Sequence, residues 1–230
     1  MINIKNVLVF AAHPDDELLG VGGTIRKLNQ QGVVCKAVIL GEGITSRADR
    51  REDADFAARD ELKKDARKAA EKIGYSSIDF YDFPDNRLDS LDLLDVIKVV
   101  SKYISEYTPD TIFTHHHGDL NIDHRIVCEA VLTACRPVNN NFVKNIFTFE
   151  TPSSTEWNYT YENSFRPNFF VDVSDTILAK LEGMNCYRSE RAMYPHPRSP
   201  EALLALAEYR GASVGYNKAE AFMCLRSLAD

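Results

Sequence analysis

Several features that mark common protein classes are missing from this sequence. No apolar run approaches the roughly 18 residues of a membrane-spanning helix. The first residues also lack the basic-then-apolar pattern of a secretory leader. The five cysteines are scattered and form no Cys-x-x-Cys pair, which argues against a disulfide framework and against a thiolate metal site. We therefore expect a cytoplasmic protein without a membrane span.

Positive charge is also in short supply. The formal net charge of −7 at pH 7 disfavours electrostatic binding to nucleic acid or to an anionic membrane. A local basic patch could still hold a phosphorylated small molecule. The composition does not fix the oligomeric state, and a homo-oligomer is compatible with it.

Patterns for nucleotide binding and for covalent catalysis are incomplete. Gly20 and Gly22 begin a Gly-x-Gly-x-x-Gly pattern, but Ile25 stands where the third glycine is required. No Gly-x-Ser-x-Gly elbow occurs, and none of the cysteines lies in a recognisable nucleophile context. A dinucleotide-binding protein or a covalent hydrolase is therefore disfavoured.

Strand-like and helix-like segments alternate along the chain. The candidate strands cover residues 6–12, 33–40, 78–83 and 111–114, and the candidate helices cover 17–31, 55–73, 91–106 and 123–135. This alternation predicts an α/β fold, a single-domain Rossmann-like three-layer sandwich with a mostly parallel sheet and helices on both faces. The domain is expected to span residues 1–230.

The alternation of strand-like and helix-like segments is less regular in two parts of the chain. The charge-dense segment 45–59 reads either as a solvated helix face, which its composition favours, or as a mobile loop beside the site. After Pro137, the pattern predicts strands at 146–150 and 168–173 and then two helices. The last helix is expected to have Ser199 as N-cap and Pro200 at its first position.

The histidines gather in two short segments. Five of the six lie in Ala-His-Pro-Asp-Asp-Glu at 12–17 and in His-His-His-Gly-Asp-Leu-Asn-Ile-Asp-His at 115–124. Each segment directly follows a strand candidate. Because ligands of a parallel sheet bind beyond the carboxyl ends of its strands, both segments are expected to meet in one crevice. At most two of the three consecutive histidines can reach it, since alternate side chains of an extended segment point to opposite sides.

His13, Asp16 and His124 are the candidate metal ligands. Two imidazoles, one carboxylate and an open position suit a hydrolytic zinc, and the same set suits iron(II). For Asp15 or Asp16 alone, capping of the helix that follows is an alternative role. Asp123 is expected to accept the second ring N–H of a ligand imidazole, with N-capping of its own helix as the alternative.

These residues resemble the signature of the PIG-L/LmbE zinc-dependent N-deacetylases of acetamido sugars, which combine Ala-His-Pro-Asp-Asp-Glu with a later x-x-Asp-His. The likeness covers essentially the whole chain, and its later segments mark a bacterial-type subgroup: 84–88, 152–157, 196–199 and 219–222. The resemblance implies that His13, Asp16 and His124 ligate zinc. It also implies that Asp15 takes a proton from the zinc-bound water and passes it to the leaving amine.

The second motif departs from the family pattern at one position. Many relatives have His-Pro-Asp-His there, and their first histidine is thought to support the oxyanion, but this chain has Asn121. Asn121 can donate a neutral hydrogen bond but cannot act as an acid. We therefore expect His196, or less favourably His117, to take the role. A structural place in a proline-flanked turn is the alternative for His196.

The expected reaction is removal of an N-acyl group, in the first place acetyl, from a small amino-sugar derivative. The candidate sugar contacts are Arg47, Asp85, Arg87 and Trp157, each of which could equally be a surface residue. One alternative is an amidase that acts on a sugar-thiol conjugate. Another is a non-catalytic module that binds a metal or a sugar nucleotide, against which the presence of Asp15 argues because no structural metal site requires it.

Overall fold

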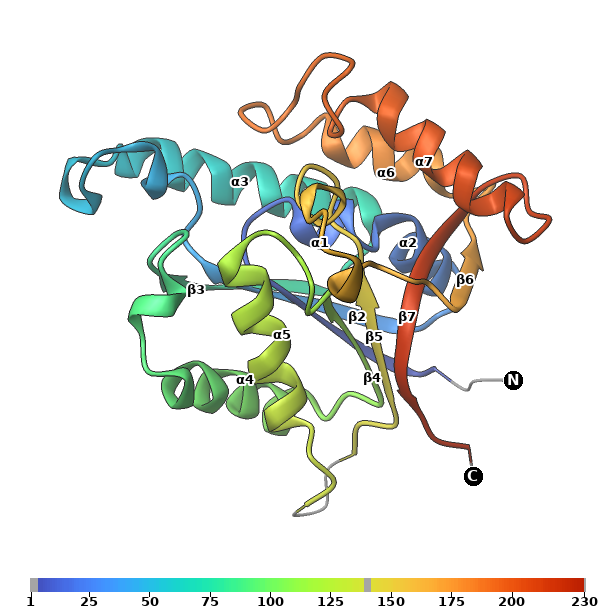
Figure 1. The fold of residues 1–230 in the computed structure, drawn as a ribbon, viewed down its shortest axis with the longest axis horizontal. Helices are drawn as coiled ribbons and strands as arrows, with labels where there is room; N and C mark the ends of the chain where they lie inside the picture. The colour runs from blue at the N-terminus through green and yellow to red at the C-terminus, as the bar shows by residue number, and fades with distance from the viewer. Residues whose placement is uncertain (1–3, 139–141, 230) are drawn as a thin grey trace.

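The structure is a computed structural model that describes residues 4–138 and 142–229. Within these residues, seven strands form one sheet in the order β3-β2-β1-β4-β5-β7-β6 (Figure 1). The strands are β1 (Asn6–Ala11), β2 (Val34–Gly41), β3 (Ser77–Phe83), β4 (Thr111–His115), β5 (Asn145–Phe149), β6 (Phe169–Asp172) and β7 (Ala219–Ser227). The first five pair in parallel, and β7 runs antiparallel to both β5 and β6. The expected mostly parallel sheet is confirmed.

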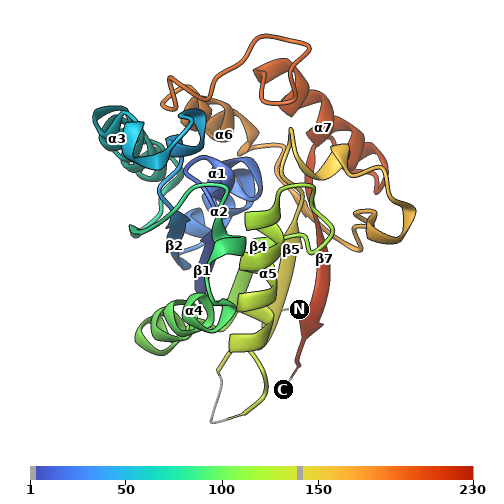
Figure 2. The same cartoon turned by 60° about the vertical axis from the view of Figure 1, so that its left-hand side comes forward.

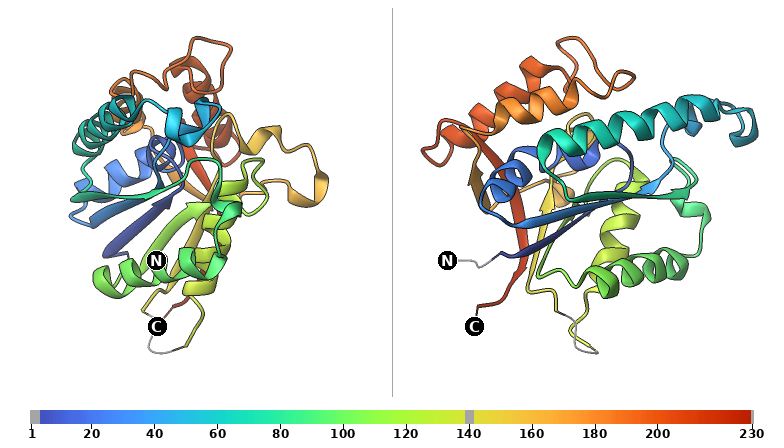
Figure 3. Two further views of the ribbon diagram at one scale, coloured as in Figure 1. Left: turned by 90° about the vertical axis from the view of Figure 1, so that its left-hand side faces the viewer. Right: turned by 180° about the vertical axis from the view of Figure 1, so that it is seen from behind.

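Helices cover both faces of the sheet, as Figures 1 and 3 show. One face carries α4 (Leu93–Tyr107) and α5 (Ile122–Ala134), which pack against each other (Figure 2). The other carries α1 (Asp16–Leu19), α2 (Gly22–Gln30), α3 (Phe56–Ile73) and α6 (Ile177–Met184), with α7 (Pro200–Ala212) packed on α6 and β7. The three-layer sandwich is therefore confirmed.

The core divides into two apolar clusters, one on each face of the sheet. Along β1, Val7 and Val9 belong to the cluster under α2 and α3, whereas Leu8 and Phe10 belong to the cluster under α4 and α5. Successive side chains of a strand point to opposite faces, so a strand that is covered on both sides must be apolar throughout. This is why residues 7–10 read as an unbroken apolar run.

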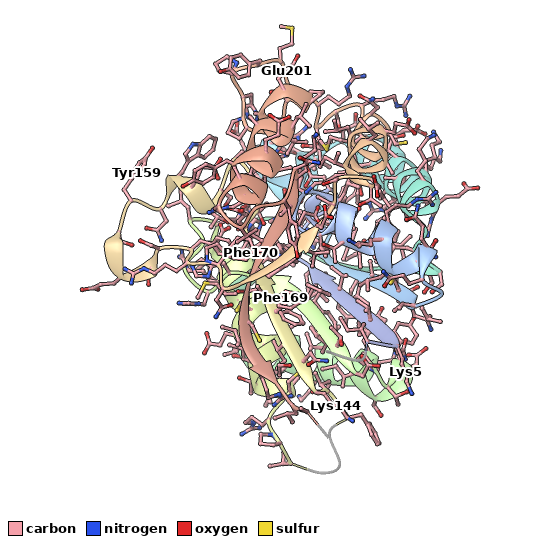
Figure 4. All side chains as sticks on the ribbon, turned by 90° about the vertical axis from the view of Figure 1, so that its right-hand side faces the viewer. Lys5, Lys144, Tyr159, Phe169, Phe170 and Glu201 are labelled. Atoms are coloured by element: carbon pink, nitrogen blue, oxygen red, sulfur yellow. The ribbon has the colours of Figure 1, made fainter. Side chains whose placement is uncertain are left out.

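Two elements differ from the sequence expectation. The helix expected over 17–31 is two helices that break around Gly20, where an added Cβ would lie 2.2 Å from the ring of Phe149. Strand β7 was not predicted from the sequence. Its first four residues are all buried, so they lack the alternation of buried and exposed positions that indicates a strand. It pairs with β6, the four-residue edge strand on which Figure 4 labels Phe169 and Phe170.

The charged segment 45–59 is not one solvated helix face. It contains two short 3-10 turns, η1 (Thr45–Arg47) and η2 (Arg51–Asp53), before α3 begins with Asp55 as its N-cap. The buried carboxylate of Glu42 accepts hydrogen bonds from Arg51 and Thr45. This anchor holds the segment against the end of β2 in a non-helical path.

The carboxyl ends of β1 and β4 lie side by side, because these strands pair in parallel. From this pair the sheet continues to β2 on one side and to β5 on the other. Such a switch in strand order opens a crevice beyond the strand ends. Among the described residues, no helix is both long and apolar enough to cross a membrane.

Candidate metal centre

Side chains from the ends of β1 and β4 converge on one carboxylate oxygen. The Oδ2 atom of Asp16 lies 3.5 Å from Nδ1 of His13 and 3.3 Å from Nε2 of His124. One donor atom from each of the three residues lies within 4.8 Å of the other two. Asp16 and His124 are buried, and His13 is partly buried. The structure thus brings together the three side chains that the two histidine segments predict as ligands.

The turn after β1 is held in an unusual backbone conformation. Asp15 has φ of 104°, in the left-handed region, at the N-cap position of α1. Its side chain makes no capping hydrogen bond within the described part of the chain, so the capping role weighed for it is not seen. Such a conformation costs on the order of 1–3 kcal/mol and is typical of functional sites. Here it leaves the Asp15 carboxylate free to face the crevice.

The ring of His13 is held from its far side. Its Nε2 atom lies 2.9 Å from Oδ2 of Asp123 and 3.2 Å from Oδ1 of Asp85. Asp123 also accepts hydrogen bonds from the backbone N–H groups of Asn86 and Leu88, so its carboxylate is fixed. Burial lowers the pKa of His13, but the hydrogen bonds that its ring donates to Asp123 and Asp16 outweigh this effect and raise that pKa well above its usual value.

The N-cap of α5 is Asn121 and not Asp123. The side chain of Asn121 accepts from the backbone N–H of Asp123 at 2.8 Å. The side-chain amide of Asn121 donates to Oδ1 of Asn86 at 2.8 Å. The alternative interpretation of Asp123 as the helix cap is therefore wrong. Asn121, the residue that departs from the family pattern, caps the helix instead.

His124 has a carboxylate beside its other ring nitrogen as well. Its Nδ1 atom lies 3.2 Å from Oδ1 of Asp119, which is buried and accepts hydrogen bonds from Ser154 and Thr155. Burial alone would lower the pKa of His124, but Asp16 and Asp119 raise it to about 9. Asp119 could not be predicted from the sequence, because its separation of five residues from His124 does not place two side chains together in a strand or in a helix.

The side chains of the three consecutive histidines lie in three different environments. His115 is buried, stacks on His124 with ring centroids 3.9 Å apart, and accepts the N–H of Ala12. Burial lowers the pKa of His115 to about 3. The ring of His116 contacts the backbone carbonyl of Asn163 at 2.9 Å. His117 is exposed and lines a separate hollow along α5, which corrects the expectation that it faces the crevice.

A cavity of about 160 Å³ opens over His13 and His124, whereas the buried Asp16 is not among the described residues that line it. Its polar lining comes from both halves of the chain and includes His13, Asp15, Ser46, Arg47, Asp85, Asn86, Asn121, His124, Ser153, Ser154, Glu190 and Arg198. Of the predicted sugar contacts, Arg47 and Asp85 lie in this lining. Asn121 lies there too, so the departure from the family pattern faces the cavity.

Other predicted residues lie elsewhere. Arg87 is exposed at the start of a 3-10 turn, and Trp157 is 40% exposed. His196 is exposed, and its ring stands edge-on to that of Trp157 with centroids 6.4 Å apart. None of the three belongs to the described residues that line the cavity. For His196 this corrects the expectation of a place beside the reacting atoms, because the chain turns its side chain outward before α7.

The carboxylate of Asp15 is paired with Arg198, a residue that was not among the predicted site residues. Nη1 of Arg198 donates to Oδ2 of Asp15 at 2.7 Å. Burial raises the pKa of Asp15 well above its usual value, and Arg198 opposes that rise. Arg198 lies two residues after His196 in the segment 196–199. Nothing in the sequence indicates which of the two basic side chains turns inward.

The donor set fits a divalent metal ion. Two imidazole nitrogens from the cavity lining and one oxygen of the buried Asp16 carboxylate match the ligand types of catalytic zinc and of iron(II). Further buried carboxylates, those of Asp85, Asp119 and Asp123, surround the two rings. A second group of donors, His13, Asp85 and Asp123, lies equally close together, but there the ring nitrogen of His13 is already engaged by Asp123.

The fold and this site define an α/β protein with a candidate mononuclear metal centre at a switch in strand order. The chain belongs to the family described as PIG-L: GlcNAc-PI de-N-acetylase, whose sequence profile matches residues 8–135. The resemblance seen in the two histidine segments is thereby confirmed, and the chain is a member of a deacetylase family.

Three known proteins illustrate the range of relatives. The chain is 28% identical to the uncharacterized deacetylase YaiS of Escherichia coli, over 80% of this chain and 91% of that one. It is also 28% identical to the diacetylchitobiose deacetylase of Thermococcus kodakarensis, over 95% and 82% respectively. The solved structure of GalB, a 4-carboxy-2-hydroxymuconate hydratase from Pseudomonas putida, superposes with a TM-score of 0.77 at 21% identity, covering 99% of this chain and 98% of that one. This last likeness shows the fold alone, so the reaction has to be argued from the site.

Proposed function

We propose that this protein is a metal-dependent N-deacetylase that removes the acetyl group from the nitrogen of an amino-sugar derivative. One observation carries the proposal: the carboxylate of Asp15 lines the same cavity as His13 and His124, whose ring nitrogens lie close to the buried carboxylate of Asp16. A structural metal site needs no such additional carboxylate. The similarity to a diacetylchitobiose deacetylase supports an acetamido sugar as the substrate class.

The first part of the proposal concerns the metal. His13, Asp16 and His124 would hold one divalent ion, zinc in the first place and iron(II) as the alternative. When bound, such an ion polarises an amide carbonyl and lowers the pKa of a coordinated water. Asp123 engages Nε2 of His13 and so keeps Nδ1 turned toward Asp16. Asp119 has the corresponding place beside His124.

The second part concerns the proton. Asp15 accepts a proton from the water whose oxygen attacks the amide carbon, and it returns that proton to the nitrogen as the carbon–nitrogen bond breaks. The products are acetate and the free amine. A pKa raised by burial favours this second step, because the carboxyl group then holds the proton until the amine leaves.

The third part concerns the sugar. Arg47 and Asp85 offer a donor and an acceptor for hydroxyl groups within the cavity. Asn121, also in the lining, is the first candidate for a neutral donor to the oxyanion. Arg87 and Trp157 would contact only a part of the substrate that extends beyond the cavity.

The proposal is tested by incubating the zinc-loaded protein with N-acetylglucosamine, N,N'-diacetylchitobiose and an N-acetylated nucleotide sugar. Released acetate and free amine are both measured, and they should be equal in amount. Asp15→Asn protein serves as the blank. Amine release from at least one acetamido sugar is expected. An N-acetylated sugar-thiol conjugate, run in parallel, tests the amidase alternative.

Two results would overturn the deacetylase proposal. Hydrolysis of the sugar-thiol conjugate alone would favour the amidase. Binding of acetamido sugars without any acetate or amine release, by protein shown to contain its metal, would favour a non-catalytic binding module.

A further inference from the structure

One guanidinium group connects Asp15 with the loop between α6 and α7. In Figure 3 this loop, in orange, lies on the same side of the sheet as α1 and α3. Arg198, near its end, donates from Nη1 to Oδ2 of Asp15 at 2.7 Å. Among the described residues, no other hydrogen-bond donor reaches that carboxylate. We infer that Arg198 is a positioning residue that holds Asp15 in its working orientation.

The guanidinium is itself held in place from two further directions. Nε of Arg198 donates to Oγ of Ser153 at 2.8 Å, and Nη1 donates to Oε2 of Glu190 at 3.1 Å. The donors of an arginine leave its plane in fixed directions. Contacts on Nε and Nη1 therefore set the plane of the group and with it the place of the Asp15 oxygen.

Glu190 extends this arrangement to the rim of the cavity. Its two carboxylate oxygens accept from Nη2 of Arg47 at 2.7 and 2.8 Å. The Glu190 side chain is only 8% exposed, whereas that of Arg47 is 53% exposed. Glu190 thus links the candidate sugar contact Arg47 with Arg198, and Arg198 with Asp15.

Asp15 needs an external support because its own surroundings provide little. Its backbone has φ of 104°, and its side chain makes no capping bond to α1 within the described residues. A carboxylate that is not fixed samples several rotamers. One oxygen held by Arg198 leaves the other free to meet a water. A general base misplaced by about 1 Å can cost on the order of 10²-fold in rate.

The supporting residues lie outside the part of the chain that matches the family profile. That match ends at residue 135, whereas Ser153, Glu190 and Arg198 follow it. The proposal rests on the proposed role of Asp15 and adds to it the source of its orientation.

Arg210 provides a matched control for a merely structural ion pair. It forms a two-point pair with Glu150, with Nε at 2.8 Å and Nη2 at 2.6 Å, and its side chain is 18% exposed. That of Arg198 is 26% exposed. Arg210 lies in α7 and is not among the described residues that line the cavity. If Arg198 only stabilised the fold, the two alanine variants would behave alike.

The experiment compares Arg198→Ala, Arg198→Lys and Arg210→Ala with the wild type, each with its metal content measured. For Arg198→Ala we expect an unchanged metal content, a fall in kcat of about 10²-fold and a KM within about threefold of the wild type. Low concentrations of methylguanidine should restore part of kcat. Arg198→Lys should lose less, and Arg210→Ala should keep the wild-type kcat.

A readout independent of turnover is the crystal structure of Arg198→Ala. The Asp15 side chain is expected in more than one rotamer or in a new one, with His13, Asp16 and His124 unmoved. A single unchanged Asp15 rotamer would overturn the inference, as would wild-type kcat in metal-replete Arg198→Ala and Arg198→Lys. A wild type that releases no acetate would instead count against the proposed function, and the crystal structure would still decide the role of Arg198.

Discussion

The two halves of the site differ in how they are built. His13, Asp15 and Asp16 lie in the turn and short helix directly after β1, and His124 lies in α5, which follows β4. Ser153, Glu190 and Arg198 come from two connections in the second half of the chain. The first half holds the groups that would do chemistry, together with Asp123 and Asp119 beside the two ligand imidazoles. The second half holds the groups that surround Asp15.

This difference predicts that the two halves can be separated by mutation. Loops tolerate change better than the strands they connect, so changes in the second half should alter turnover while the metal stays bound. Changes in the first half should remove the metal or the base itself.

The largest effect is expected for Asp16→Ala. Its Oδ2 atom is the point on which both imidazoles converge, so the variant should lose the roughly one metal ion per chain expected for the wild type and all measurable deacetylation. Metal analysis after chelator-free purification checks this, and His124→Ala should give the same result. Asp85→Asn is the control, because Asp85 belongs only to the second donor group. Metal loss in Asp85→Asn with retention in Asp16→Ala would move the centre to that group.

The next effect concerns stability. Glu220 of β7 accepts hydrogen bonds from the N–H groups of Gly23 and Thr24 and pairs with the buried Lys180 at 2.7 Å. Glu220→Ala leaves Lys180 buried without its carboxylate, so the free energy of unfolding should fall by about 3–5 kcal/mol. Urea denaturation measures it. Glu208→Ala breaks the pair between the exposed Glu208 and Lys218, whose charged atoms lie 3.9 Å apart, and should cost below about 1 kcal/mol. Equal losses in both variants would contradict the prediction.

Asp15→Asn separates the base from the metal. Asparagine keeps the size of the side chain but cannot accept the proton, so kcat should fall by about 10²-fold or more. The metal content should stay that of the wild type. Steady-state kinetics together with metal analysis check both statements, with Asp95→Asn on the exposed face of α4 as the control. Full turnover by Asp15→Asn would exclude the proposed mechanism.

The smallest effect distinguishes Asn121 from His196. A single donor to a developing oxyanion is typically worth about 10²-fold in rate, and Asn121 lines the cavity but already donates to Asn86. We therefore expect Asn121→Ala to lower kcat by about tenfold and His196→Ala, an exposed position, to change it by less than about twofold. The sequence alone suggested the opposite order. A collapsed rate for His196→Ala would return the oxyanion role to that histidine.

The fold class and the candidate ligand set could be predicted from the amino-acid sequence. Apolar runs such as residues 7–10 follow from coverage of the sheet on both faces, and the N-cap Ser199 follows from local hydrogen bonding to the next turn. His13 and Asp16 are neighbours in one turn, and the parallel sheet brings His124 to them. These features depend on local periodicity and on a general rule of topology.

The distant side chains that complete the site could be identified only in the folded molecule. Arg198 meets Asp15 across 183 positions of sequence, and Asp119 reaches His124 through an orientation fixed by Ser154 and Thr155. His196 and Arg198 are both basic and two residues apart, yet one is exposed and the other lines the cavity. The physical reason is that side-chain direction in a loop depends on the partners available in three dimensions, and residue type and spacing do not encode those partners.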